Sequence, residues 1–439
     1  MLTRICLSFA LLFAMPVWSQ VEPDATGPPP ASEDQMQTPP PVSGEAYPTA
    51  TGSEARSNFL RAGFTLNTAY NDNVLAGATA KPISDLTYTI SPTIALDQTT
   101  SRQHRIFTYS PGFTTYQHTS ALNNIDQNAV LHFQYRLSPH ATISLDELFS
   151  QSSNVFNQPY GGVSGSTLSP TEAVVAPFAE LINNVASAEL SYQFSRNGMV
   201  GGSGTSTILN YPNPAQAVGL ANSNSRGGSA FYNLRLSSMQ YIGLTYQYSR
   251  MIASPVTGGS VTQTHTIYFF YTLYLKHALS LSVSGGPQHF NEVQSPFPAS
   301  ASWTPAVTAS MGWQGSHTNF AASYSRTVTG AGGLLGAFET DNASASARWQ
   351  MARTWTVGSA GTYATQKNVL PAIFPSSSGG RTVSGTISFQ HPISERFTVK
   401  LGYTRLHQSY TGVAVVSENP DSDSENISIS YQFARSLGR

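Results

Sequence analysis

Apolar and polar residues alternate with a period of two along most of the chain from Asn58 onward. Segments of about ten residues with this alternation, rich in Tyr, Phe, Thr, Val and Ile, recur to the end. In segments 184–195 and 425–433 every second residue is apolar and most of the others are polar. Because successive side chains of a strand point to opposite faces, the pattern predicts strands with one apolar and one polar face.

The connections between these segments alternate between short and long. Short turns are expected at Ser138–His140, Arg196–Gly198, Ser237–Met239, Lys276–His277, Gln314–Ser316, Ala352–Arg353 and Pro392–Ser394. Long loops are expected near 151–183, 209–225, 251–261, 291–302, 329–340, 366–381 and 409–424. This arrangement predicts an all-β, transmembrane, antiparallel up-and-down barrel over residues 57–433, with short periplasmic turns and long extracellular loops. We expect about 18 strands, within a range of about 16 to 18.

The composition supports a membrane barrel over a soluble sandwich or a β-solenoid, which would also alternate. Only 10% of the residues are charged, and hydrophobic residues reach 40% without forming a membrane-spanning helix after the N-terminal region. No repeat of fixed period is present. Aromatic residues lie toward the segment ends, as in interfacial girdles: Tyr70, Phe149, Tyr192, Phe194, Tyr246, Tyr248, Trp303, Trp313, Trp349, Trp355, Tyr403, Tyr431 and Phe433.

The segments that flank the barrel indicate export. Residues 1–19 have the pattern of a secretory signal, and the Pro-rich segment 20–56 predicts a disordered periplasmic tail. The tail is either a spacer or a tether to a periplasmic partner. Segment 426–433 resembles the assembly signal that ends outer-membrane barrels, although residues 434–439 follow it here. We therefore expect the cell outer membrane of a Gram-negative-type bacterium, with outer-membrane lipid and the barrel-assembly machinery as partners.

The first predicted strand contains a short motif. Tyr70 is followed by Asn71, Asp72, Asn73 and Val74. The motif resembles the opening strand of the type 2 β-barrel porin family, whose members accompany bacterial exopolysaccharide export. The resemblance implies an outer-membrane channel, with polysaccharide as a substrate class.

The Asn71–Asn73 segment also has two interpretations of its own. Asn and Asp side chains bond to nearby backbone, so the segment would begin the first long loop. Alternatively, its carboxamide and carboxylate groups would bind a cation or a sugar.

The polar faces of the strands assign several titratable side chains to the lumen. These candidate pore-lining residues are Arg61, His132, Arg136, Asp146, Glu189, Arg235, Arg348 and Lys400. A lumen with more cations than acids would favour small anionic solutes. The alternative is that these charges pair across the barrel wall and brace it.

Two further features bear on the lumen. Aromatic residues on the expected inner face, namely Phe231, Tyr268, Phe270 and Tyr274, would either stack on sugar rings or fill a narrow barrel. The loop 151–183 would either fold inward as a constriction or form an outer adhesive surface.

The remaining chemistry points away from other classes of protein. A net charge of −1 gives no basic patch for a nucleic acid. No catalytic serine motif, phosphate loop or metal-ligand spacing is present, so we expect no enzyme, cofactor or metal. The sequence thus favours a porin-like channel with passive or weakly selective diffusion that serves exopolysaccharide export, or else a plugged structural or adhesive barrel that acts through its extracellular loops.

Overall fold

The computed structural model describes residues 58–75, 81–152, 179–254, 259–275, 279–294, 298–330, 333–369, 379–411, 413 and 421–437. Its strands are β1 (Phe59–Asn71), β2 (Asp85–Thr99), β3 (Gln103–Tyr116), β4 (Asn124–Arg136), β5 (Ala141–Ser152), β6 (Leu181–Gln193), β7 (Gly198–Asn210), β8 (Asn222–Ser237), β9 (Gln240–Ser254), β10 (Ser260–Leu275), β11 (Leu279–Gln294), β12 (Ser300–Gln314), β13 (Thr318–Gly330), β14 (Ala337–Gln350), β15 (Thr356–Asn368), β16 (Gly380–Pro392), β17 (Phe397–Tyr410) and β18 (Asp421–Ser436). One 3₁₀ turn, η1 (Ser120–Leu122), is the only helical element within these residues. None of the described residues forms a helix of the length and apolarity that crossing a membrane requires.

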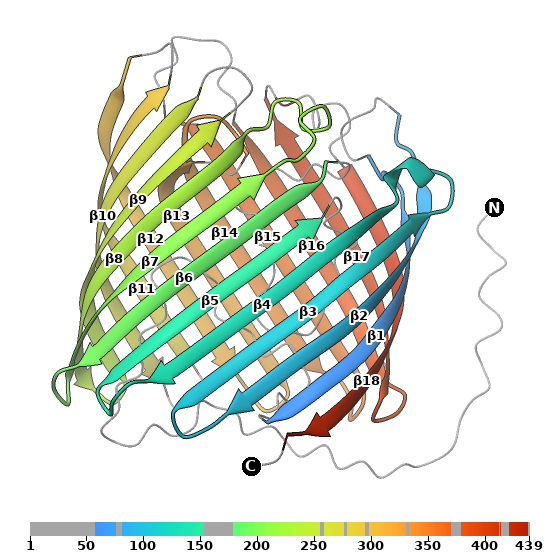
Figure 1. Cartoon of the computed structure of the whole chain (residues 1–439), viewed down its shortest axis with the longest axis horizontal. Helices are drawn as coiled ribbons and strands as arrows, with labels where there is room; N and C mark the ends of the chain where they lie inside the picture. Colours follow the sequence, from blue (N-terminus) through green and yellow to red (C-terminus); the bar gives the residue numbers. More distant parts are fainter. Residues whose placement is uncertain are drawn as a thin grey trace.

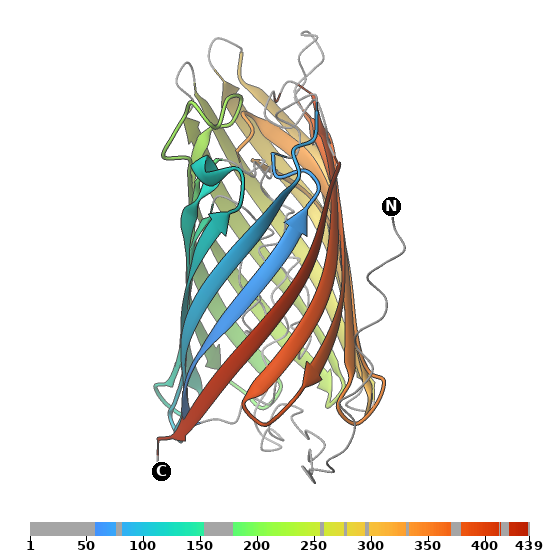
Figure 2. The ribbon, with the colours of Figure 1, turned by 90° about the vertical axis from the view of Figure 1, so that its right-hand side faces the viewer.

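The strands form one closed antiparallel barrel of 18 strands. Each strand pairs with its neighbours in the chain, and β1 also pairs with β18, so the sheet has no free edge (Figure 1). The strands tilt steeply, and the barrel is broader in Figure 1 than in the perpendicular view of Figure 2. The predicted fold and strand number are confirmed.

The two ends of the barrel differ in their connections. At the end where β1 begins and β18 stops, short turns such as 100–102 and 137–140 join the strands; we call this the short-turn end. The opposite, long-loop end carries the longer connections, including 211–221. The predicted turn at Lys276–His277, the signal, the tail and most of loop 151–183 lie outside the described residues. Strand β18 runs to Ser436, which pairs with Phe59, so the wall continues beyond the predicted end at Phe433.

Side chains alternate between an outward apolar face and an inward polar face. In β10, Ile267, Phe269 and Tyr271 are exposed on the outside, whereas Thr266, Tyr268 and Phe270 are buried on the inside. The aromatic residues that we predicted for the girdles all occupy outward positions or adjacent turns; Trp303, the most exposed, is 66% accessible. An apolar band flanked by aromatic girdles is the outer surface that a lipid bilayer requires.

The Asn71–Asn73 segment closes the barrel at the long-loop end. The Asp72 N–H donates to the carbonyl of Asp423 at 3.1 Å, and Asp72 Oδ1 accepts from the Asp423 N–H at 2.7 Å. Asn73 Nδ2 donates to the carbonyl of Asp421 at 2.7 Å, and Ser422 Oγ donates to the carbonyl of Asn73 at 3.1 Å. The segment therefore holds the first strand to the last strand, and its side chains bond to the backbone of β18 rather than to nearby backbone as expected.

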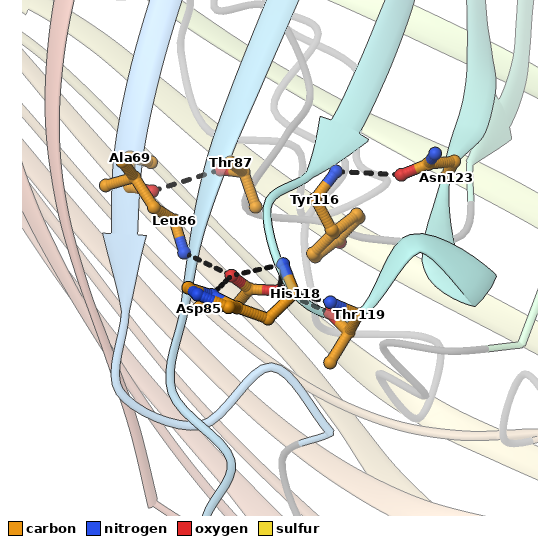
Figure 3. A network of polar contacts seen from close by, with 8 residues as sticks. All are labelled: Ala69, Asp85, Leu86, Thr87, Tyr116, His118, Thr119 and Asn123. Carbon is orange, nitrogen blue, oxygen red and sulfur yellow. Dashed lines mark hydrogen bonds and ion pairs between the residues drawn. The ribbon is translucent and has the colours of Figure 1, made fainter.

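A second polar network lies at the same end, around Asp85 at the start of β2 (Figure 3). The Asp85 carboxylate accepts bonds from the backbone N–H groups of Leu86, His118 and Thr119. The Thr119 hydroxyl, at 2.6 Å, and the His118 ring, at 3.0 Å, complete the contacts. This carboxylate thereby fixes the β3–β4 connection against the start of β2.

The seam predicts a measurable loss of stability. Asp72→Ala removes a charged acceptor from the Asp423 N–H, at a cost of about 1–3 kcal/mol. We expect a lower midpoint in the heat-induced mobility shift of the refolded barrel. Asp72→Asn, which keeps an acceptor oxygen, should lie between this variant and the wild type. Identical midpoints for all three proteins would show that the seam does not depend on this side chain.

Candidate functional site

All eight candidate pore-lining residues occupy inward positions of the wall. Arg61 lies near the start of β1, Arg136 ends β4, and Lys400 is the fourth residue of β17. All eight lie in the half of the barrel nearer the short-turn end, where we call them the charged ring: Arg61, His132, Arg136, Asp146, Glu189, Arg235, Arg348 and Lys400. The five cations each make at least one polar or electrostatic interaction.

The ring also contains inward residues that the sequence did not identify. Asp97 of β2 lies 3.6 Å from the His104 ring of β3, and His104 stacks edge-on against His132 at 5.5 Å. His132 in turn bonds to Asp146, its direct partner across β4 and β5. With Asp97, the ring holds five cations and three acids.

Three more inward acids lie at the long-loop end, namely Asp85, Asp126 and Glu292, and all three are fully or nearly buried. The described inward wall therefore carries six acids and five cations. The predicted excess of cations exists in the ring but not along the whole described lumen.

The middle of the lumen is lined by paired hydroxyl groups. Inward Ser and Thr residues face each other across neighbouring strands and share hydrogen bonds, for example Ser203 with Ser229 at 2.8 Å and Thr362 with Ser384 at 2.7 Å. Further pairs are Thr65–Ser430, Thr89–Thr114, Ser225–Ser249, Thr272–Ser282, Ser284–Thr308, Ser323–Ser344 and Thr386–Thr404. Each hydroxyl keeps acceptor capacity beyond its shared bond. The result is an uncharged surface that can bond to polar solutes.

The inner aromatic residues mainly pack against the wall. A Cβ at Gly243 would lie 2.3 Å from the Phe270 ring, and a Cβ at Gly201 would lie 2.2 Å from the Phe231 ring. The rings therefore fill the space that the two glycines leave. Tyr268 and Phe270 are only 3% and 6% exposed, which favours packing over a free stacking surface.

The upper end of β13 separates from β12 and bends into the lumen, whereas β14 stays paired with β15 as far as Phe338. Pairing of β12 with β13 stops at Val307 and Arg326. Beyond that point, the inward Gln288 side chain of β11 bonds to both backbone groups of Val328, at 2.7 and 3.0 Å. Glu292, also inward on β11, accepts the Ala337 N–H at 2.9 Å. Because these bonds bypass β12, the upper end of β13 lies on the inner side of β12.

The tip of the β13–β14 hairpin is buried in an apolar cluster at the long-loop end. Gly333 and Gly336 have φ values of 94° and 120°, a region that favours glycine, and they present Leu334 between them. Leu334 and Phe338 are 1% and 0% exposed. They belong to what we call the mouth cluster: Ala179, Leu209, Tyr211, Ala217, Leu334, Phe338, Tyr410 and Val413.

The mouth cluster spans the barrel from one side to the other. It joins the end of β7 and the 211–221 loop to the end of β17, which lies nearly opposite in the strand order. The Ala221 N–H also donates to the carbonyl of Gly333 at 2.7 Å. Burial in the cluster, with a smaller contribution from Tyr410, raises the pKa of Tyr211 well above its usual range. The cluster therefore forms a buried, apolar bridge across the long-loop end.

The sequence analysis missed this bridge. One signal was present, since Leu334 and Leu335 are apolar residues in a loop that should otherwise be polar. The predicted constriction, loop 151–183, lies almost entirely outside the described residues. Among the described residues, no group of three His, Cys, Asp or Glu side chains is arranged to hold a metal ion.

Comparisons with known proteins find similar solved structures, but no family model and no curated protein matches the chain by sequence. The Pseudomonas aeruginosa barrel OccK2 (OpdF) is similar at 10% identity and a TM-score of 0.44, over 86% of this chain and 98% of that one. The iron transporter FrpB from Neisseria meningitidis is similar at 9% identity and a TM-score of 0.40, over 86% and 82% of the two chains. At this level the likeness carries no information about substrate.

The mouth cluster predicts how the barrel can be opened. Leu334→Asp would place an unpaired charge in an apolar cluster, which costs several kcal/mol and should expel the hairpin tip. We expect a single-channel conductance in planar bilayers several-fold larger than that of the wild type. Val218→Asp is the matched control, because Val218 lies in the neighbouring loop but is 54% exposed. Equal conductance of Leu334→Asp and wild type would show that the cluster does not limit the pore.

Proposed function

We propose that this protein is an outer-membrane channel for polar, hydroxyl-rich solutes. The observation that carries the proposal is the lumen: a closed barrel wall with paired Ser and Thr hydroxyls, and an apolar cluster at one end that includes the tip of the β13–β14 hairpin. The aromatic-flanked apolar band supports insertion into a bilayer. In that orientation, the long-loop end is extracellular and the short-turn end is periplasmic.

The chemistry of the lumen supports oligosaccharides as the substrate class. Hydroxyl pairs such as Ser323 with Ser344 offer donors and acceptors without charge, as neutral sugars require. The resemblance of the first strand to porins of exopolysaccharide export points in the same direction. The charged ring at the periplasmic end, with five cations and three acids, would favour sugars that carry acidic groups.

The mouth cluster also favours a second candidate, a plugged barrel that acts through its outer loops. Its buried core, with Phe338 at 0% and Val413 at 1% exposure, is as dry as a protein interior. The two functions differ in what happens when the hairpin moves: a channel conducts, whereas a plugged scaffold loses its loop surface.

The charged ring predicts the ion selectivity of the open channel. Arg136→Ala combined with Arg235→Ala removes two of its five cations. In the Leu334→Asp background, the ratio of anion to cation permeability should fall by about a factor of two, measured from reversal potentials. Arg105→Ala is the control, because Arg105 lies at the same end but faces outward. An unchanged permeability ratio would show that permeating ions do not pass close to the charged ring.

The substrate class is tested by permeation of uncharged sugars. Liposomes that contain the Leu334→Asp barrel should release neutral maltodextrins faster than liposomes with the wild type. Absence of both sugar release and ion conductance from a folded, heat-modifiable barrel would reject the channel in favour of the plugged scaffold. Ion conductance without sugar release would reject oligosaccharides as the substrate.

A further inference from the structure

Two arginines face each other on the outside of the barrel. Arg226 of β8 and Arg250 of β9 are direct partners in the antiparallel register, and both are exposed. They lie toward the long-loop end, one and two outward positions beyond Tyr248 and Tyr246 of the aromatic girdle. Two residues of a tilted strand correspond to about 5 Å along the membrane normal, so the arginines lie at the level of lipid headgroups.

Among the described residues, no acid lies directly opposite or diagonal to this arginine pair. Ser206 of β7 lies opposite Arg226, and Gln263 of β10 lies opposite Arg250. The described outward residues diagonal to the pair are also uncharged or histidine. Like charges directly opposite on neighbouring strands repel each other. An anion bound between the two guanidinium groups would remove that repulsion, and guanidinium pairs particularly well with phosphate oxygens.

A furrow of small residues runs from the arginine pair toward the middle of the membrane. Its floor is made of outward Gly202, Gly204, Gly228 and Ala230, which face each other across β7 and β8. A Cβ at Gly204 would meet nothing within 4 Å, and those at Gly202 and Gly228 would meet only single backbone oxygens. The furrow is therefore open to the lipid side, with Leu190 on one border and Tyr246 on the other.

We infer that the arginine pair and the furrow bind a phosphorylated lipid of the outer leaflet. The phosphate lies between Arg226 and Arg250, and an acyl chain lies along the glycines below. Both parts are needed. The arginines supply positive charge for the phosphate. The furrow has no large side chains, so an acyl chain can lie along it.

A second groove on the opposite wall lacks the first of these parts. It has a volume of about 400 Å³ and a floor that includes Ala345, Gly361 and Gly385, and it also ends at an arginine, Arg405. That arginine, however, is 3.3 Å from Asp421 and directly opposite Asp423. A phosphate would meet these carboxylates, so the inference is limited to the wall of β7 to β9.

The test measures lipid binding to the refolded full-length barrel by native mass spectrometry in detergent. The probes are lipid A, the same lipid after removal of its phosphates, and inorganic phosphate. We expect the wild type to retain lipid A, and Arg226→Gln combined with Arg250→Gln to bind it about 100-fold more weakly, about tenfold for each arginine. Arg226→Lys with Arg250→Lys should recover part of the affinity, and Arg381→Gln on the opposite wall should have no effect.

The furrow has its own variant. Gly204→Leu keeps both arginines and points into open space, so it should fold and yet weaken lipid A binding. Equal retention of lipid A by the wild type and the double glutamine variant would overturn the inference. Equal binding of inorganic phosphate and lipid A would show a phosphate site without a lipid furrow. An unchanged affinity of Gly204→Leu for lipid A would show the same. Either result would also overturn the inference. The inference rests on the proposed membrane location but not on conduction, because a barrel that does not conduct can still bind lipid.

Discussion

The pairing of β1 with β18 is the constraint on which the rest of the structure depends. In a bilayer no water is available to bond to an exposed sheet edge, so every strand needs two neighbours. The seam meets this requirement along its whole length, from Phe59 opposite Ser436 to Asn71 opposite Ser424. The Asp72 and Asn73 contacts then hold the seam just beyond the last paired residues. With the wall closed by its backbone, side chains on the two faces are free to serve different purposes.

Inside the barrel, the inward side chains form three layers. Charges lie at the short-turn end, hydroxyl pairs line the middle, and the mouth cluster bridges the long-loop end. Only the last layer depends on a segment that separates from a neighbouring strand, and its anchors on β11 are two side chains, Gln288 and Glu292. The tip around Leu334 is held by a few hydrogen bonds and one apolar cluster, so it can move while β14 stays paired with β15 as far as Phe338. This separation makes a gated channel compatible with a rigid barrel.

The sequence predicted those features that are local along the chain. Alternation in segments such as 425–433 gave the strands, the turns gave the strand number, and the inward positions of Arg136 and Arg235 followed from the same period. Contacts between distant residues were not predictable. Glu292 and Ala337 are 45 positions apart in the sequence, and Asp72 and Asp423 are 351 apart. No local sequence pattern can predict contacts over such separations. Asp126 lies on the same face of β4 as Arg136, so its inward position followed from the same period and was overlooked. Glu292 was missed because segment 291–302 was expected to be a loop, whereas β11 extends to Gln294.

Strand β9 shows how closely the two faces are linked and why their functions can still be separated. Arg250 points outward to the arginine pair, whereas the next residue, Met251, points inward and packs so closely on the hairpin that a Cβ at Gly330 would lie 1.5 Å from its methyl carbon. The same strand therefore supports the hairpin from within and carries the basic pair outside. Because neighbouring side chains point in opposite directions, a change at Arg250 leaves the contact of Met251 intact. Lipid binding and conductance thus report on independent surfaces of one wall, although they share its strands.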